Sequence, residues 1–298
     1  MRKNFSKHYL KSMNKIKYFI QFIIIIIIFS IFKILGLKIS SFVGGKLFQI
    51  IGPIFRSKSL IQENIKRVFP DIDQINLNEI TSSMWNNYGR VFAEYMFIKK
   101  FRYQKENKNI IIDGKEILED IKKNNQKVVF ISGHFSNFEL MAMEIEKAGI
   151  NLAAIYRPLN NIFLNFLMEK IRKNYICKNQ IKKGIGGVKE LVRLNKEGYS
   201  TALMIDQRVS EGIKSTFFNE EAFTTTIPAQ LVKKFKTPVV PIFIDRFDSI
   251  KFKITIHKPL SFLDNDSAED ITLKLNKVLE KMIRENPKYW IWSHNRWK

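Results

Sequence analysis

The residues best suited to chemistry lie in the segment Ser132-Gly-His-Phe-Ser-Asn-Phe-Glu139. It follows a short apolar run, Lys127 to Ile131, whose β-branched residues and polar flanks predict a buried strand. After it comes a run of good helix formers that ends at Gly149, a residue type that commonly terminates helices. His134 is therefore expected in a strand-to-helix loop and Glu139 in the first helical turn. A histidine and a carboxylate that meet across such a turn can act as a general base and its orienting group.

A purely structural role for these residues fits the local pattern equally well. Ser136 and Glu139 have the spacing of a capping box, in which the glutamate accepts a hydrogen bond from the backbone N–H of the capping residue. His134 would then be a loop histidine without a chemical role. The spacing H-x-x-x-x-E alone leaves both interpretations open.

Composition limits the compartment and the partners. At 298 residues the chain can bury a substantial core, and most of it could form one domain. With 50 Lys+Arg against 28 Asp+Glu, the formal net charge of +22 indicates an acidic partner: nucleic acid, anionic lipid or an acidic carrier protein. The single cysteine, Cys177, excludes an intrachain disulfide framework and indicates a reducing compartment. No second His or Cys stands at metal-ligand spacing to His134, so we expect neither a metal site nor a cofactor.

An apolar stretch near the N-terminus separates these partners. A basic leader up to Lys17 precedes about twenty mostly apolar residues that begin at Tyr18, which is just long enough to span a bilayer. No convincing small-x-small cleavage site follows, which favours a membrane anchor over a signal peptide and argues against a soluble nucleic-acid binder. We therefore divide the chain into a leader and anchor, residues 1–38, and a catalytic domain, residues 39–298.

A second apolar segment, Ile39 to Phe55, leaves the membrane topology open. One crossing with the basic leader in the cytoplasm would export the rest of the chain. Alternatively, the two segments could form a shallow hairpin, or both could lie in the membrane interface. Because the remainder is also strongly basic and has one cysteine, we expect the catalytic body to face the cytoplasm.

The rest of the chain predicts an α/β fold. Residues 57–103 are expected to be helical, since aromatic and apolar side chains recur there at spacings of three and four. From Ile110 onward strands alternate with helices, which predicts a largely parallel central sheet flanked by helices. The expected strands are 127–131, 151–156, 199–205 and 239–244, with an edge strand at 252–257. The expected helices are about 137–147, 162–173, 187–195 and 268–285.

Polar residues follow the predicted strands at the edge where open α/β sheets bind their ligands. His134 follows the first strand, Arg157 the second, Asp206 and Gln207 the third, and Asp245-Arg246 the fourth. A basic, carboxylate-bearing rim around a histidine suits an anionic or phosphorylated substrate. We expect Arg157 to contact that substrate, whereas Asp206 fits either a functional role or the cap of a turn.

Five ordered blocks give a resemblance to a known family. Gly133-His-Phe-Ser-Asn-Phe-Glu139 resembles the H-x-x-x-x-D/E block of the glycerolipid acyltransferase superfamily, and most closely the Gly-His-Phe-Gly-Asn-Trp-Glu form of the late acyltransferases of lipid A biosynthesis. The other blocks are Tyr156-Arg-Pro158, Ile205-Asp-Gln207, Phe217-Phe218 with Thr224 to Pro228, and the Trp-x-Trp-x-His-x-Arg-Trp-Lys ending at Lys298. The likeness runs from the anchor to the last residue. The departures are Ser136, Phe138 and Asn219, where the family usually has Gly, Trp and often Gly.

This resemblance implies a membrane-bound acyltransferase at the bacterial inner membrane, with its catalytic domain facing the cytoplasm. It would move a fatty acyl chain from the thioester of acyl carrier protein to a hydroxyl group of a phosphorylated lipid A precursor. His134 would take the proton from the attacking hydroxyl, and Glu139 would fix the tautomer of the imidazole. Arg157, Arg172, Asp206 and Gln207 would form the substrate-binding set, with the arginines holding phosphates.

Two other interpretations of the chain remain. A related acyltransferase for a lysophospholipid, ornithine lipid or glycolipid would differ only in its acceptor. A basic, membrane-anchored binding protein without enzymatic activity would need no His134–Glu139 pair beside a basic rim. The C-terminal aromatic residues also allow two placements, because Trp290 and Trp292 could lie at the headgroup level or pack on the sheet from one strand face.

Overall fold

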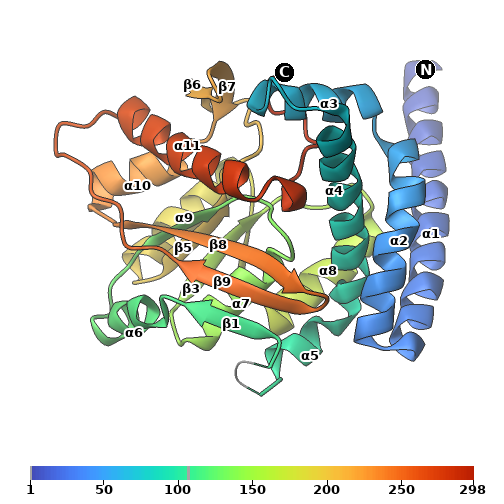
Figure 1. The fold of residues 1–298 in the computed structure, drawn as a ribbon, viewed down its shortest axis with the longest axis horizontal. Helices are drawn as coiled ribbons and strands as arrows, with labels where there is room; N and C mark the ends of the chain where they lie inside the picture. The colour runs from blue at the N-terminus through green and yellow to red at the C-terminus, as the bar shows by residue number, and fades with distance from the viewer. Residues whose placement is uncertain (1, 106–107) are drawn as a thin grey trace.

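A computed structural model describes the backbone of residues 2–105 and 108–298, and the side chains of residues 14–105, 108–184 and 186–298. A seven-stranded sheet forms its centre, in the order β1-β9-β8-β2-β5-β3-β4 (Figure 1). All neighbouring strands are parallel except β8 and β9. The strands are β1 (Ile110–Asp113), β2 (Val129–Ser132), β3 (Leu152–Tyr156), β4 (Asn179–Lys182), β5 (Ser200–Met204), β8 (Val239–Asp248) and β9 (Lys251–Ile256). The α/β class with a largely parallel sheet is confirmed.

Helices connect and cover these strands. They are α6 (Lys115–Lys123), α7 (Glu139–Lys147), α8 (Ile162–Tyr175), α9 (Ile185–Lys196), α10 (Ile227–Phe235) and α11 (Ala268–Glu285). A two-stranded hairpin, β6 (Ile213–Phe217) and β7 (Glu220–Thr224), packs beside α11. Because β2 lies in the middle of the sheet under helices, every one of its residues is buried, which explains its continuous apolar run.

The N-terminal part forms a helical layer against one end of the sheet (Figure 1). Helix α1 (Arg2–Leu35) turns at Gly36, where φ is 77°, into α2 (Leu37–Phe55), which runs back beside it. Helices α3 (Lys58–Val68), α4 (Gln74–Glu94) and α5 (Ile98–Arg102) follow, with a 3₁₀ turn η1 (Tyr95–Phe97) before α5. The glycines of α2 form a close contact with α4, since a Cβ atom on Gly44 would lie 2.5 Å from the carbonyl oxygen of Gly89.

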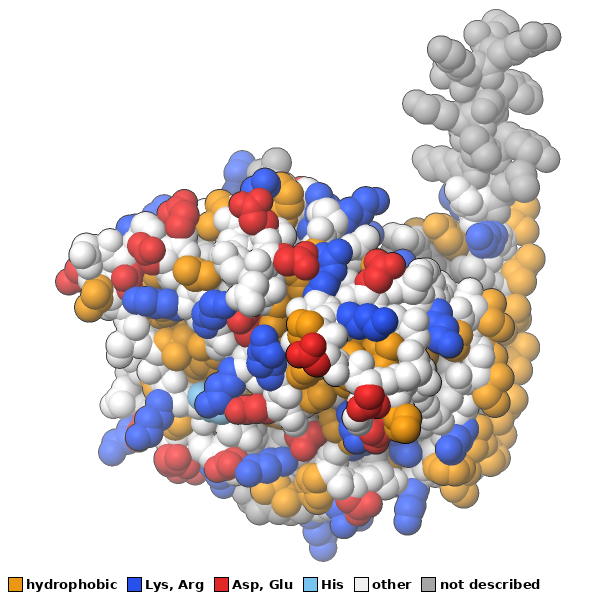
Figure 2. Space-filling view, turned by 45° about the horizontal axis from the view of Figure 1, so that its top comes forward, with side chains coloured by type: hydrophobic (Ala, Val, Ile, Leu, Met, Phe, Trp, Pro, Cys, Tyr) orange, Lys and Arg blue, Asp and Glu red, His pale blue; other side chains and the backbone are white. Residues whose placement is uncertain are grey.

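Helix α1 lies along the outside of this layer. The stretch Asn14–Leu35 is long and apolar enough to cross a membrane, and only 11% of this apolar stretch is buried inside the protein. Its inner face contacts two body helices, through Phe19 and Phe163 of α8 at 5.5 Å between ring centroids and through Phe29 and Phe92 of α4 at 4.9 Å. Its outer face is a band of exposed hydrophobic side chains (Figure 2).

The structure differs from the predicted strand layout in two places. Strand β9 was expected at an edge, but it lies between β1 and β8; its alternating pattern reflects one exposed face of the sheet. Strand β8 was expected to end at Ile244, but it continues to Asp248, so Asp245 and Arg246 lie within the strand and not on the ligand-binding rim.

Candidate active site

A histidine–aspartate pair joins two neighbouring strands at their carboxyl ends. His134 follows β2, and Asp206 follows the adjacent strand β5. The Nδ1 atom of His134 lies 2.8 Å from Oδ1 of Asp206, and the backbone N–H of His134 donates to Oδ2 at 2.7 Å. The indole N–H of Trp290 donates to the same Oδ2 at 2.9 Å. Since an ionised carboxylate only accepts, Nδ1 carries the proton and Nε2 of His134 is the basic atom.

The charge of Asp206 is stabilised although the residue is fully buried. Burial by itself would raise the pKa of this carboxyl group, but the neighbouring His134 and the hydrogen bonds from His134 and Trp290 outweigh it and hold the pKa below its ordinary value. A buried, ionised carboxylate at Nδ1 would stabilise the imidazolium that forms when Nε2 takes up a proton.

The structure corrects the expected partner of the imidazole. We expected Glu139 to fix the tautomer of His134, but that contact belongs to Asp206. Glu139 begins α7 and accepts hydrogen bonds from Arg172 of α8, from Nε at 2.9 Å and also from Nη2. Phe138 packs edge-on against the imidazole of His134, with ring centroids 4.7 Å apart. Although burial opposes the charge of Arg172, the adjacent Glu139 raises the pKa of this guanidinium above its ordinary value.

The capping-box interpretation is wrong. Ser136 adopts φ = 41° in the loop and makes no side-chain cap of α7, whose N-cap residue is Phe138. The loop is held instead by the backbone N–H of Ser136, which donates to the carbonyl oxygen of Tyr289 at 3.2 Å.

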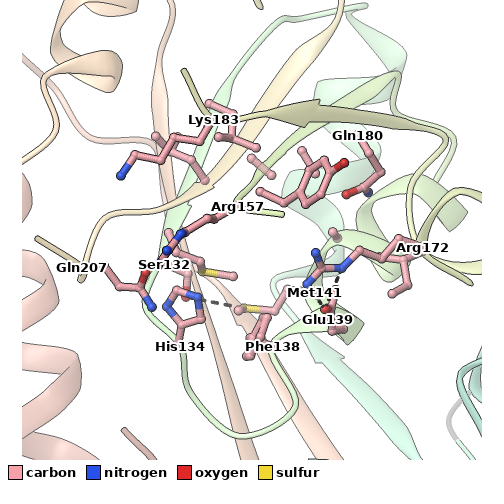
Figure 3. A pocket seen from close by; sticks show the side chains of 18 of the residues that line it. Ser132, His134, Phe138, Glu139, Met141, Arg157, Arg172, Gln180, Lys183 and Gln207 are labelled. Carbon is pink, nitrogen blue, oxygen red and sulfur yellow. Dashed lines mark hydrogen bonds and ion pairs between the residues drawn. The ribbon is translucent and has the colours of Figure 1, made fainter. Parts of the chain in front are cut away.

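A pocket of about 400 Å³ opens in front of His134 (Figure 3). Of the predicted residues, His134, Glu139, Arg157, Arg172 and Gln207 line it, whereas Asp206 lies behind His134 and is not among the described residues that line the pocket. Much of the remaining wall is apolar and includes Phe130, Met141, Ile145, Ala154, Ile176 and Ile242. A pocket of this size with an apolar wall and few polar groups is typical of a small-molecule site.

Sequence reasoning missed several residues of this region. Lys183 lines the pocket near Arg157 (Figure 3). Arg246, expected on the rim, is buried and paired with Glu94 of α4, Nη1 to Oε1 at 2.6 Å. The position of Glu94 inside the apolar run Val91-Phe-Ala-Glu-Tyr-Met-Phe97 could have indicated a buried ion pair, because a carboxylate among core residues needs a cationic partner.

The C-terminal segment completes the site from behind. Trp290 and Trp292 are buried, and their rings pack edge-on with centroids 4.7 Å apart. Of the two placements that the sequence left open, the structure therefore shows packing inside the protein and not a position at the headgroup level. The two residues follow a 3₁₀ turn, η2 (Pro287–Tyr289), so they do not share the face of a strand. His294 accepts the backbone N–H of Arg208 at Nε2, at 3.0 Å. Burial lowers the pKa of His294 to about 4, so it is neutral at physiological pH.

Across the described residues, no group of three or more His, Cys, Asp or Glu side chains is placed to hold a metal ion.

Comparison with known proteins identifies the class. The chain matches the model of the bacterial lipid A biosynthesis acyltransferases over residues 4–298. The protein therefore belongs to this family of transferases.

Individual relatives are distant but cover most of the chain. It is 22% identical to the lipid A biosynthesis myristoyltransferase of Escherichia coli K12, over 83% of this chain and 76% of the relative. It is 22% identical to the lauroyltransferase of the same organism, over 82% and 79% of the two chains. A lipid A biosynthesis acyltransferase of Haemophilus influenzae is 24% identical, over 85% and 81%.

Proposed function

We propose that the protein transfers a fatty acyl group from the thioester of acyl carrier protein to a hydroxyl group of a phosphorylated lipid A precursor. The observation that carries this proposal is the His134–Asp206 pair at the head of a pocket with an apolar wall and cationic residues. The apolar wall suits an acyl chain, and Arg157 and Lys183 suit phosphate groups. The relatives named for myristoyl and lauroyl transfer in lipid A biosynthesis support the same acceptor.

In the proposed mechanism Nε2 of His134 is the general base. It takes the proton of the acceptor hydroxyl as the oxygen attacks the thioester carbonyl. The C–O bond forms and the C–S bond breaks. The imidazolium then returns the proton to the departing thiolate. Asp206 stabilises that imidazolium, and general-base catalysis of this kind contributes about 10²–10⁴-fold.

Glu139 acts in this proposal through Arg172. The ion pair holds the guanidinium at the pocket wall, where it binds phosphate oxygens of the acceptor or of the donor's phosphopantetheine. Gln207, beside Asp206, lines the pocket and supplies a neutral hydrogen-bonding group.

The proposed location is the inner membrane, with the catalytic body in the cytoplasm where acyl carrier protein is available. The exposed apolar face of α1 suits lipid, and no Asp or Glu precedes Glu63, so the basic residues of α1 and α2 attract anionic headgroups. The net charge of +22 also suits an acidic donor protein.

The test measures acyl transfer from acyl carrier protein thioesters to a lipid A precursor, using membranes with wild-type protein or single variants. We expect His134→Ala and Asp206→Asn each to lower kcat by about 10²–10⁴-fold. Glu139→Gln should mainly raise KM, and its effect should not add to that of Arg172→Ala, because the two residues act as one pair. Full activity of His134→Ala would refute the mechanism.

The acceptor is tested in the same assay. Transfer that depends on His134 but reaches only a lysophospholipid, ornithine lipid or other glycolipid would keep the mechanism and change the acceptor. Absence of transfer to every acceptor would favour a membrane-bound binding protein.

A further inference from the structure

The loop between His134 and Glu139 is fastened to a buried carboxylate outside the pocket. Glu94, at the end of α4, is fully buried and accepts hydrogen bonds from three separate elements. Arg246 of β8 donates to Oε1 at 2.6 Å and to Oε2 at 3.1 Å, and Ser41 of α2 donates to Oε1 at 2.7 Å. The third donor is Asn137 of the loop, whose Nδ2 lies 2.9 Å from Oε2.

Fold stability alone is a weak explanation for such a group. Desolvation of two charges offsets much of their attraction, so a buried ion pair is often replaceable by apolar residues. The bidentate geometry of Glu94 and Arg246 instead gives a fixed direction to each carboxylate oxygen. Asn137 can then donate from only one position.

The loop has a conformation that needs such support. Ser136 has φ = 41°, which residues with a side chain rarely adopt unless the surroundings hold them. Its carbonyl oxygen accepts from Nδ2 of Asn87 at 3.3 Å, and Oδ1 of Asn87 contacts Nη2 of Arg246 at 3.4 Å. The strained residue and Asn137 are therefore both linked to the Glu94–Arg246 pair.

We propose that Glu94, Arg246 and Asn137 form a positioning site for the catalytic loop. The carboxylate of Glu94 fixes Asn137, and thereby sets the relative placement of His134 before it and Glu139 after it. None of the three is among the described residues that line the pocket, so they act through the loop and not on substrate. The expected effect on kcat rests on the proposed acyl transfer. The expected effect on the conformation of the loop does not.

The chain offers a matched control for this proposal. Asn137→Ala and Ser41→Ala each remove one hydrogen-bond donor from the same carboxylate, the first from the loop and the second from α2. Both leave the Glu94–Arg246 pair intact and avoid an unpaired buried charge. A difference between the two variants therefore reports the loop and not the ion pair.

We expect Asn137→Ala to lower kcat about 10²-fold with KM changed less than about threefold, because small misplacements of reacting groups cost this much. Ser41→Ala should change kcat less than about threefold, although the melting temperatures of the two variants fall by similar amounts. Losses of activity that follow the melting temperatures equally in both variants would overturn the proposal.

Amide hydrogen exchange provides a readout that does not depend on acyl transfer. Asn137→Ala should raise the exchange rate of the amides at 134–138 at least about tenfold, whereas Ser41→Ala should leave them near wild-type rates. If wild-type protein transfers no acyl group, the proposed function has failed, and the exchange data still decide the positioning role. Unchanged exchange in Asn137→Ala would refute it.

Discussion

At the scale of single residues, the site is organised by two hydrogen-bond acceptors, Asp206 and His294, and by the N–H groups that donate to them. Asp206 accepts hydrogen bonds from the ring and the backbone of His134 and from the indole of Trp290. His294 accepts a hydrogen bond from the backbone N–H of Arg208, which lies two residues after Asp206 in the chain. The first acceptor has to be charged and the second has to be neutral. Protonation of either one would convert an acceptor into a donor that faces another donor.

The neutral state of His294 gives a stability that depends on pH. Burial lowers its pKa from 6.5 to about 4, so between these values the unfolded chain binds a proton that the folded protein does not. The stability contributed at neutral pH is therefore lost as the pH falls from about 6.5 towards 4. We expect the melting temperature of wild type to fall more steeply over this range than that of His294→Gln, which can still accept the N–H bond but does not titrate.

Thermal melts of both proteins at a series of pH values from 7.5 to 4.5 test this. The carboxylates titrate in both proteins, so their contributions cancel in the difference. Parallel curves would show that His294 does not carry the effect.

At the scale of elements, the N-terminal layer depends on close contact between α2 and α4. Gly44 and Gly89 face each other, and a Cβ atom on either would meet backbone of the other helix. Backbone cannot move aside as a flexible side chain can. The glycines that look like interruptions of an apolar segment in the sequence are therefore the contact surface between two helices.

Substitution of these glycines should show this directly. We expect Gly44→Ala to lower the free energy of unfolding by about 1–3 kcal/mol, because the added methyl group overpacks the interface. Gly186 is the matched control, since it lies in helix α9 with nothing within 4 Å of an added Cβ atom, and Gly186→Ala should be neutral or stabilising by up to about 1 kcal/mol. Denaturant unfolding gives both values. Equal effects of the two substitutions would contradict the packing argument.

The elements also show what the sequence could and could not predict. Strands β2, β3, β5 and β8 follow from short apolar runs, helices α7, α8, α9 and α11 follow from helix-forming segments, and the placement of His134 just after a strand follows with them. The partner of His134 does not, because Asp206 lies 72 residues away and meets it only because β2 and β5 are neighbours in the sheet. Strand order is a tertiary property, so the nearby Glu139 was the natural but incorrect choice. Strands β1 and β4 were not predicted, because neither is a continuous buried run as the equally short β2 is.

At the scale of the whole molecule, the hydrophobic surface is concentrated on one side. Exposed apolar residues recur along α1 at spacings of three and four, at Ile16, Ile20, Ile23, Ile27, Ile31 and Ile34. Helix α8, which contacts α1, follows Leu159 and Asn160 of the pocket wall, and Asn161 at its start donates to the carbonyl oxygen of Tyr18 at 2.8 Å. The helix that carries the apolar face is therefore in direct contact with the helix that follows one wall of the pocket.

Membrane association of this face can be measured with vesicles that contain anionic lipid. We expect Ile27→Asp to lower the vesicle-bound fraction, with an apparent partition coefficient about tenfold or more below wild type, because it places a charge where an apolar side chain meets lipid. Leu263→Asp is the control, since Leu263 is also exposed and precedes α11, whose first turn lies at the end of the molecule away from α1 (Figure 1). Flotation that is equally weakened by both substitutions would show that α1 is not the lipid-binding face.

The position of Trp290 affects when the site forms during protein synthesis. Translation produces the chain from its N-terminus, so His134 leaves the ribosome about 150 residues before Trp290. At about 5–20 residues per second, this delay is on the order of 10–30 s. During that interval the sheet can already bring His134 and Asp206 together, but the indole N–H that holds the carboxylate does not yet exist. A chain that is still being translated can therefore contain every strand of the sheet before it contains the indole that completes the site.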